Sequence, residues 1–343
     1  MIKVLDTTLR EGEQSPGVYF PPDRKLELAR MLDEVGVDII EVGNPMADPD
    51  IEKAVRNAVK MGLRARIGAH SRCKLEDVKR AIGTGATFVG VFISVSARRL
   101  ELDYGLDLPA AIAQIQATVG YARSQSKDLM IRYTPEDAVR SKFEDVVAAA
   151  AAAVEAGANV ISLADTTGFM SPWGGDERRM GALVAKMKAE LAKKNLHPEI
   201  AVHCHNDRGL AIANALDACR SGAGIVDATV LGLGERTGIV DMAELMINLD
   251  KLPTNSGKYN LAMLPKLYDL VSHYAKRVVN YRQAVVGKDT FNSSMGLETK
   301  ALIQAPHLYW SYDPAKAGRE WSVSLGADST PESIEVALKL VFR

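Results

Sequence analysis

The chain of 343 residues is 47% hydrophobic and 25% charged, a composition that is typical of a globular enzyme and excludes a disordered or fibrous protein. Its formal net charge of −1 gives no basic field for nucleic acid, and no apolar run reaches the roughly 18 residues that cross a bilayer, so we expect neither as a partner. Three scattered cysteines and the lack of a signal peptide before the first apolar run favour the cytoplasm.

Eight short apolar runs, each bounded by turn residues, predict β-strands. They are 2–5, 37–42, 65–69, 88–94, 129–133, 160–164, 200–203 and 226–231. Segments with helical periodicity follow them at 22–35, 49–61, 74–84, 108–124, 143–156, 177–194, 210–221 and 239–249. Eight alternating units predict an α/β fold, a (β/α)8 TIM barrel, over residues 1–254.

The pattern changes after the predicted barrel. Helix-like segments at 261–278, 297–304 and 331–341 predict an appended C-terminal helical region, 255–343, that lies over the mouth of its own barrel or of a partner's. An open, doubly wound sheet is the alternative to a barrel. No phosphate-binding glycine fingerprint follows the first strand to support that alternative.

Two histidines at the end of the seventh predicted strand indicate a metal site. Because side chains alternate along a strand, His203 and His205 leave the same face about 7 Å apart along the backbone. Glu11 follows the first strand, and the C-terminal ends of all strands meet at one mouth of a barrel. The carboxylate and the two imidazoles would therefore lie close enough to coordinate one divalent cation. A pair of core histidines satisfied by neighbours is the alternative. Arg10, beside such a metal, would stabilise an enolate or an oxyanion.

Three motifs resemble those of a known family. They are D-T-T-L-R-E-G-E-Q-S-P-G at 6–17, H-C-H-N-D at 203–207 and G-L-G-E-R-T-G at 232–238. Together the chain resembles the metal-dependent acyl-CoA condensing enzymes, which include homocitrate, isopropylmalate, citramalate and Re-type citrate synthases. The stretches 70–73 and 132–137 are most similar to homocitrate synthase. The resemblance implies a Claisen condensation of acetyl-CoA with an α-keto dicarboxylate, 2-oxoglutarate first and oxaloacetate second, in a homodimer with exchanged lids.

The same resemblance implies roles for individual residues. The ligands of the divalent metal, which would be magnesium, manganese, cobalt or zinc, would be Glu11, His203 and His205. The residues that would contact the keto acid are Gln14, His70, Arg132 and Thr166. Arg10 would polarise the keto carbonyl. For Arg132, an ordinary ion pair at the end of the barrel is the alternative.

The C-terminal region departs from the family. In homocitrate and isopropylmalate synthases a catalytic histidine precedes a tyrosine by eleven residues, and the matching residues here are Glu298 and Tyr309. Ala201 also replaces the acid found two positions before the first metal histidine of homocitrate synthases. Either Glu298 is itself the catalytic base, held in place by Tyr309, or the chain is a metal-dependent lyase or aldolase that cleaves a hydroxy acid or its thioester.

Overall fold

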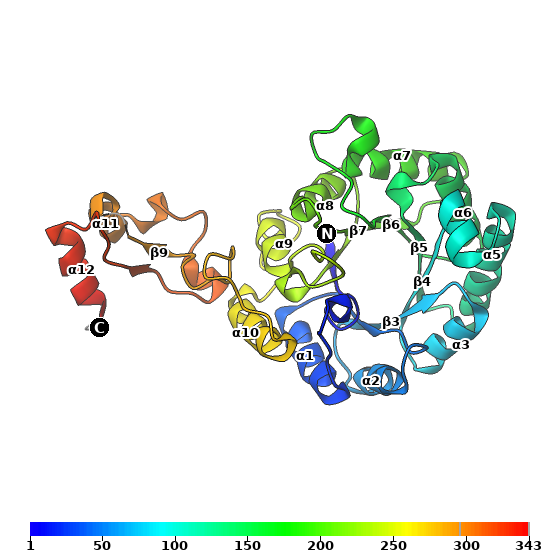
Figure 1. Cartoon of the computed structure of the whole chain (residues 1–343), viewed down its shortest axis with the longest axis horizontal. Helices are drawn as coiled ribbons and strands as arrows, with labels where there is room; N and C mark the ends of the chain where they lie inside the picture. Colours follow the sequence, from blue (N-terminus) through cyan, green and yellow to red (C-terminus); the bar gives the residue numbers. More distant parts are fainter. Residues whose placement is uncertain (295, 342–343) are drawn as a thin grey trace.

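The computed structural model describes residues 1–294 and 296–341, and within them eight parallel strands close into a barrel (Figure 1). The strands are β1 (Lys3–Asp6), β2 (Ile39–Gly43), β3 (Arg66–Arg72), β4 (Phe88–Ser94), β5 (Met130–Glu136), β6 (Val160–Asp165), β7 (Glu199–Cys204) and β8 (Ile225–Ala228). Each strand pairs with the next, and β8 returns to pair with β1. The predicted TIM barrel is therefore confirmed.

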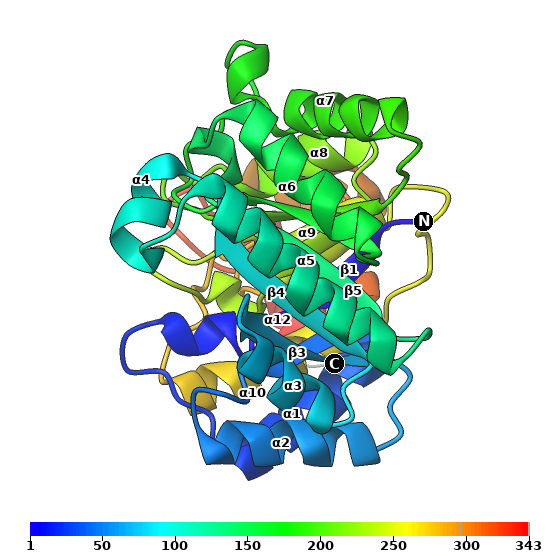
Figure 2. The same ribbon diagram turned by 90° about the vertical axis from the view of Figure 1, so that its right-hand side faces the viewer.

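Helices cover the outside of the barrel. The longer ones are α1 (Pro22–Val35), α2 (Pro49–Lys60), α3 (Leu75–Gly83), α5 (Leu108–Gln125), α6 (Phe143–Glu155), α7 (Met180–Lys193), α8 (Ala211–Arg220) and α9 (Met242–Leu249). Figure 2 shows α5 and α6 lying over β4 and β5. Inside the barrel, a small apolar cluster fills the space near the N-terminal ends of the strands, which leaves the C-terminal ends to polar side chains. Its buried members are Leu5, Ile39, Phe88, Val160, Ala201 and Ile225.

Two predicted boundaries differ from the structure near the eighth strand. β8 ends at Ala228 instead of continuing to Leu231, because the chain turns into a 3-10 helix at Val230–Gly232, in which Leu231 has a left-handed backbone with φ 63°. α9 begins at Met242 instead of residue 239. The Asp241 side chain caps this helix by accepting hydrogen bonds from the backbone N–H groups of Ala243 and Glu244. Ile239 lies outside the helix and forms an isolated β-bridge with His205.

The chain leaves the barrel through α10 (Leu264–Ala275), which packs against α1. Beyond α10 the chain forms an extension that projects away from the barrel, as Figure 1 shows on the left. It contains α11 (Gly296–Gln304), α12 (Pro331–Val341) and a two-stranded parallel sheet of β9 (Asn292–Ser293) and β10 (Ser322–Val323). In the described part of the chain, no helix is both long enough and apolar enough to cross a bilayer.

Candidate active site

A cavity of about 230 Å³ opens at the C-terminal mouth of the barrel. Eight of the ten site residues expected from the sequence line it: Arg10, Glu11, Gln14, His70, Arg132, Thr166, His203 and His205. The other lining residues are Asn44, Phe92, Thr134, Glu136, Ala164, Asp227 and Glu235. These side chains come from the C-terminal ends of the strands and the loops that follow, which is where TIM barrels place their active sites.

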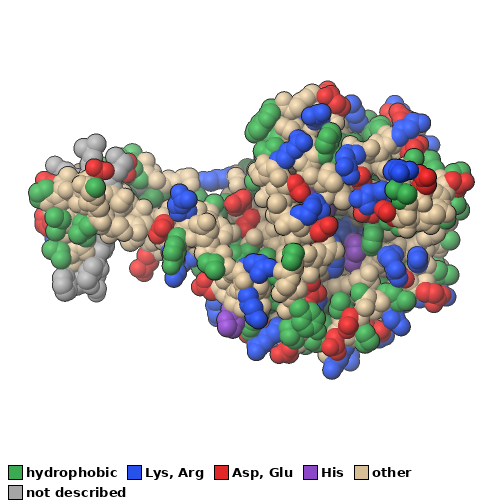
Figure 3. Space-filling model, in the orientation of Figure 1, with side chains coloured by type: hydrophobic (Ala, Val, Ile, Leu, Met, Phe, Trp, Pro, Cys, Tyr) green, Lys and Arg blue, Asp and Glu red, His purple; other side chains and the backbone are tan. Residues whose placement is uncertain are grey.

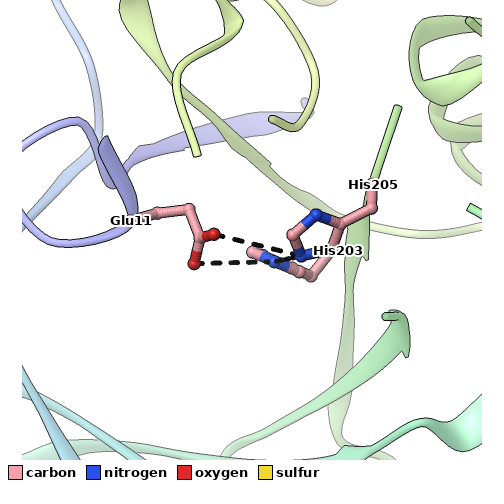
Figure 4. A group of neighbouring side chains, drawn as sticks. All are labelled: Glu11, His203 and His205. Atoms are coloured by element: carbon pink, nitrogen blue, oxygen red, sulfur yellow. Dashed lines mark hydrogen bonds and ion pairs between the residues drawn. The ribbon is translucent and has the colours of Figure 1, made fainter. Parts of the chain in front are cut away.

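Glu11, His203 and His205 meet in this cavity as one group (Figure 4). Glu11 lies in a turn after β1, and the histidines lie at the end of β7. The two imidazole Nε2 atoms are 3.3 Å apart, and oxygens of Glu11 lie 4.0 Å from His203 Nε2 and 3.9 Å from His205 Nε2. Atoms bound about 2.1 Å from one ion stand about 3 to 4.2 Å from one another, depending on whether they are adjacent or opposite, so this donor set fits a divalent cation.

The charges and protons on these three groups suit a metal. His203 Nδ1 lies 3.0 Å from a carboxylate oxygen of Asp227, which can only accept, so Nδ1 is the donor to Asp227 and Nε2 is the nitrogen that faces His205 and Glu11. Burial and the neighbouring His203 lower the pKa of His205 to about 4, so this ring is neutral at pH 7. Although burial opposes the charge, Arg10 lowers the pKa of Glu11, which is therefore ionised.

Glu41, in the middle of β2, orders the floor of the cavity by accepting hydrogen bonds from four donors. Its Oε2 accepts from Thr7 Oγ1 and Arg10 Nε, both at 2.7 Å. Its Oε1 accepts from His70 Nδ1 at 3.0 Å and Arg132 Nη2 at 3.3 Å. Burial alone would raise the pKa of Glu41, but Arg10 and the other partners hold it well below its ordinary value. Glu41 is therefore a buried anion that fixes the orientation of predicted site residues.

Arg132 lies in the same floor with only 1% of its surface exposed. Its Nη1 donates to both carboxylate oxygens of Asp227 at 2.9 Å, in addition to the contact with Glu41. Among the described residues that line the cavity, Arg132 Nε, the hydroxyl of Thr134 and His205 Nδ1 are buried without a hydrogen-bond partner. Because such groups cost free energy when left unpaired, the two atoms on β5, Arg132 Nε and the Thr134 hydroxyl, indicate where a polar ligand would bind. The proposed contact of Arg132 with substrate stays a prediction.

Sequence reasoning placed Glu41 at a strand end near the site without giving it a role and missed Asp227, although a signal was present for both. Glu41 is the one acid in the buried segment Ile39–Gly43, and Asp227 is the one acid in Ile225–Ala228. An acid in a strand that is buried on both faces needs a partner of opposite charge. Gly90, on β4, leaves room for the hydrogen bond between His70 and Glu41. A Cβ at this position would lie 3.1 Å from His70 Nδ1 and 3.3 Å from Glu41 Oε1.

The motif at 232–238 is bonded to the turn that carries Glu11. The hydroxyl of Ser15 accepts from the backbone N–H of Gly234 and donates to its carbonyl, both at 2.9 Å. The backbone N–H of Glu235 donates to Glu11 Oε1 at 3.2 Å. The glycine-rich loop after β8 therefore helps to hold the Glu11 carboxylate in place.

The same loop is also bonded to the loops after β6 and β7. Arg236 donates to both carboxylate oxygens of Asp207, at 2.7 and 3.0 Å, and to the backbone carbonyl of Thr166 at 2.6 Å. A Cβ at Gly238, whose φ is 78°, would lie 1.7 Å from the carbonyl oxygen of Gly232, so only glycine fits there. The loop thus joins three strand ends around the cavity.

Glu298 and Tyr309 do not line the cavity. Glu298 lies on α11 and accepts from Ser293 Oγ at 3.5 Å, whereas Tyr309 follows α11 and is 41% exposed. Both belong to the extension that projects away from the barrel (Figure 1). Their catalytic roles stay predictions.

The sequence matches the HMGL-like family over residues 1–271. It is 37% identical over 337 residues to a homocitrate synthase of Pyrococcus abyssi, an alignment that covers 98% of this chain and 89% of that protein. A 2-isopropylmalate synthase of Sulfolobus acidocaldarius is 32% identical over 333 residues, with coverage of 96% and 82%. These findings confirm the resemblance to acyl-CoA condensing enzymes.

Among solved structures, a hydroxymethylglutaryl-CoA lyase from Pseudomonas aeruginosa matches with a TM-score of 0.67 and 19% identity, covering 81% of this chain and 94% of that one. At this identity the likeness shows the barrel fold alone. The chain therefore belongs to the HMGL-like family, and its sequence relatives include homocitrate and isopropylmalate synthases.

Proposed function

We propose that the protein is a metal-dependent acyltransferase that condenses acetyl-CoA with an α-keto dicarboxylate, 2-oxoglutarate first and oxaloacetate second. The main support is the convergence of Glu11, His203 and His205 in a cavity whose wall also carries Arg10 and Arg132. Relatives named homocitrate synthase that match 98% of the chain support the same reaction. Magnesium, manganese, cobalt and zinc all accept such nitrogen and oxygen ligands. We expect the enzyme in the cytoplasm.

The chain's own groups would position the keto acid and stabilise charge. A divalent ion bound at the three ligands would supply Lewis-acid chemistry at the keto carbonyl. Arg10, which is paired to Glu11 and Glu41, is a fixed positive charge beside these ligands and would stabilise the oxyanion that develops on the keto oxygen. Arg132 Nε and the Thr134 hydroxyl would donate to a substrate carboxylate.

We further propose that Glu298 is the catalytic base, oriented by Tyr309, and that a second copy of the chain delivers both in a homodimer with exchanged lids. The projection of α11 away from its own barrel supports such an exchange (Figure 1). Glu298 would take a proton from the acetyl methyl group, and the resulting carbanion would form the carbon–carbon bond to the keto carbon. Water would then cleave the thioester and release coenzyme A as a free thiol. A monomer in light scattering would exclude the exchange.

Release of free thiol tests the reaction. Metal-loaded protein is incubated with acetyl-CoA and a panel of keto acids, while thiol and product mass are followed. We expect thiol release with 2-oxoglutarate and its loss in Glu11→Ala. Glu76→Ala is the matched control, since Glu76 pairs with Lys79 on the surface at 2.7 Å, and it should keep the wild-type rate. No thiol release across the panel, from protein that still binds metal, would end the proposal.

A further inference from the structure

A short segment after β4 forms part of the rim of the cavity. It consists of α4 (Ala97–Arg99) and a single π-helical turn (Leu100–Tyr104), a rare conformation that is frequent at functional sites. Two of its side chains bind the carboxylate of Glu136, which lines the cavity at the end of β5. Arg99 Nη1 donates to one oxygen at 2.8 Å, and the hydroxyl of Tyr104 donates to the other at 3.0 Å. Both oxygens of Glu136 are thus held by the rim segment.

The cavity wall is short of positive charge. Among the described residues that line it, the arginines are Arg10 and Arg132 and the carboxylates are Glu11, Glu136, Asp227 and Glu235. Both arginines are already paired to acids of the site. A bound divalent ion would bring the net charge of these six side chains only to zero. A keto acid with two carboxylates would therefore still meet no net positive charge.

Two basic side chains on the rim pair with carboxylates of the wall. Arg99 lies 2.8 Å from Glu136, its shortest ion pair, and also reaches Asp103 at 3.3 Å and Asp137 at 3.5 Å. Arg236 pairs with Glu235 at 3.0 Å in addition to its contact with Asp207. The space-filling view shows basic and acidic side chains side by side around the hollow over the barrel (Figure 3). Of the two pairs, the one with Arg99 is the more enclosed, because Glu235 is 55% exposed and Glu136 only 25%. An unpaired charge on Glu136 would therefore be screened less by water.

We propose that Arg99 sets the preference for a keto acid with a second carboxylate by neutralising Glu136. The inference rests on the keto acid of the proposed function. Without Arg99, the Glu136 carboxylate would face the second carboxylate of the ligand as an unpaired like charge. A keto acid that ends in a methyl group would not meet this repulsion, so the loss is selective and on the order of tenfold in affinity.

Calorimetric titration of the metal-loaded protein with 2-oxoglutarate and with 2-oxobutyrate measures this preference without requiring turnover. Arg99→Ala should weaken 2-oxoglutarate binding on the order of tenfold and leave 2-oxobutyrate within about twofold. Added salt should reduce the difference, since the rim is partly open to water. Arg98→Ala is the matched control, because it removes the same charge from the residue just before Arg99. Arg98 is 72% exposed and pairs with Glu101 at 2.8 Å, so its loss should change the affinity for neither keto acid.

Glu136→Gln separates charge from structure, because glutamine keeps an acceptor for Tyr104 but carries no charge. The double variant Arg99→Ala/Glu136→Gln should regain the wild-type ratio of affinities. The proposal is overturned if Arg99→Ala loses equal affinity for both keto acids, or if the double variant binds 2-oxoglutarate as weakly as the single one. It is also overturned if the wild-type protein binds both keto acids with equal affinity. Preferential binding without thiol release would instead refute the proposed function and leave this inference standing.

Discussion

Replacing Asp227 by asparagine tests whether the floor of the cavity orients a metal ligand. Asp227 accepts two hydrogen bonds from Arg132 at 2.9 Å and one from His203 at 3.0 Å. An amide offers a single oxygen to these donors, so at least one N–H would face another N–H. Because Arg132 keeps Glu41 as a counter-charge at 3.3 Å, we expect the low end of the range for a broken buried ion pair, about 3 kcal/mol of unfolding free energy. Metal affinity should fall about 10- to 100-fold.

Chelator competition measures the metal affinity of this variant, and urea unfolding of the metal-free protein measures its stability. Asp217→Asn is the matched control, because Asp217 is mostly buried and pairs with Arg179 at 2.7 Å outside the cavity. The control should lose stability and keep its metal affinity. If Asp227→Asn binds metal as tightly as the wild type, Asp227 does not orient His203 and the reasoning is refuted.

Three further substitutions test other parts of the molecule. Ser15→Ala leaves the N–H and carbonyl of Gly234 unpaired, so urea unfolding should show a loss of about 2 kcal/mol, and an unchanged value would contradict the role of this hydroxyl. Burial raises the pKa of Asp241 to about 7, so the folded protein keeps a proton that the unfolded chain releases above about pH 4, and stability should fall as pH rises from about 4 to 7. In Asp241→Asn, urea unfolding across this range should show a shallower fall; the same slope would refute the titration. Glu298→Gln should keep metal affinity but lower turnover about 100-fold, whereas Glu320→Gln in the same extension should not, and a wild-type rate would assign Glu298 to structure.

The sequence was sufficient to predict the barrel and most of the residues at its mouth. Alternation along β7 puts His203 and His205 on one face, and closure of eight strands brings Glu11 to them, so two local rules together predict the metal site. The partners within the floor were not predictable in this way. Glu41 and Asp227 are 91 and 95 residues from Arg132, and periodicity gives the face on which a side chain lies but not its neighbour across a barrel.

The direction of the C-terminal extension was also beyond the sequence. Helical periodicity predicts the segment of α12 correctly, at 331–341, but it carries no information on where a helix lies relative to a barrel. The direction depends on how α10 packs against α1, and on the hydrogen bond between Gln283 and Asp241 at the base of the extension. These are contacts between residues far apart in the chain.

The four donors that share Glu41 limit how the range of keto-acid substrates can be changed by mutation. Since Arg10, His70 and Arg132 are oriented by one carboxylate, their substitutions should be epistatic, and libraries that vary one floor position at a time will mostly return inactive proteins. The pair of Arg99 and Glu136 has no hydrogen bond to that carboxylate among the described residues, so directed evolution of a new keto-acid range should succeed first on the rim.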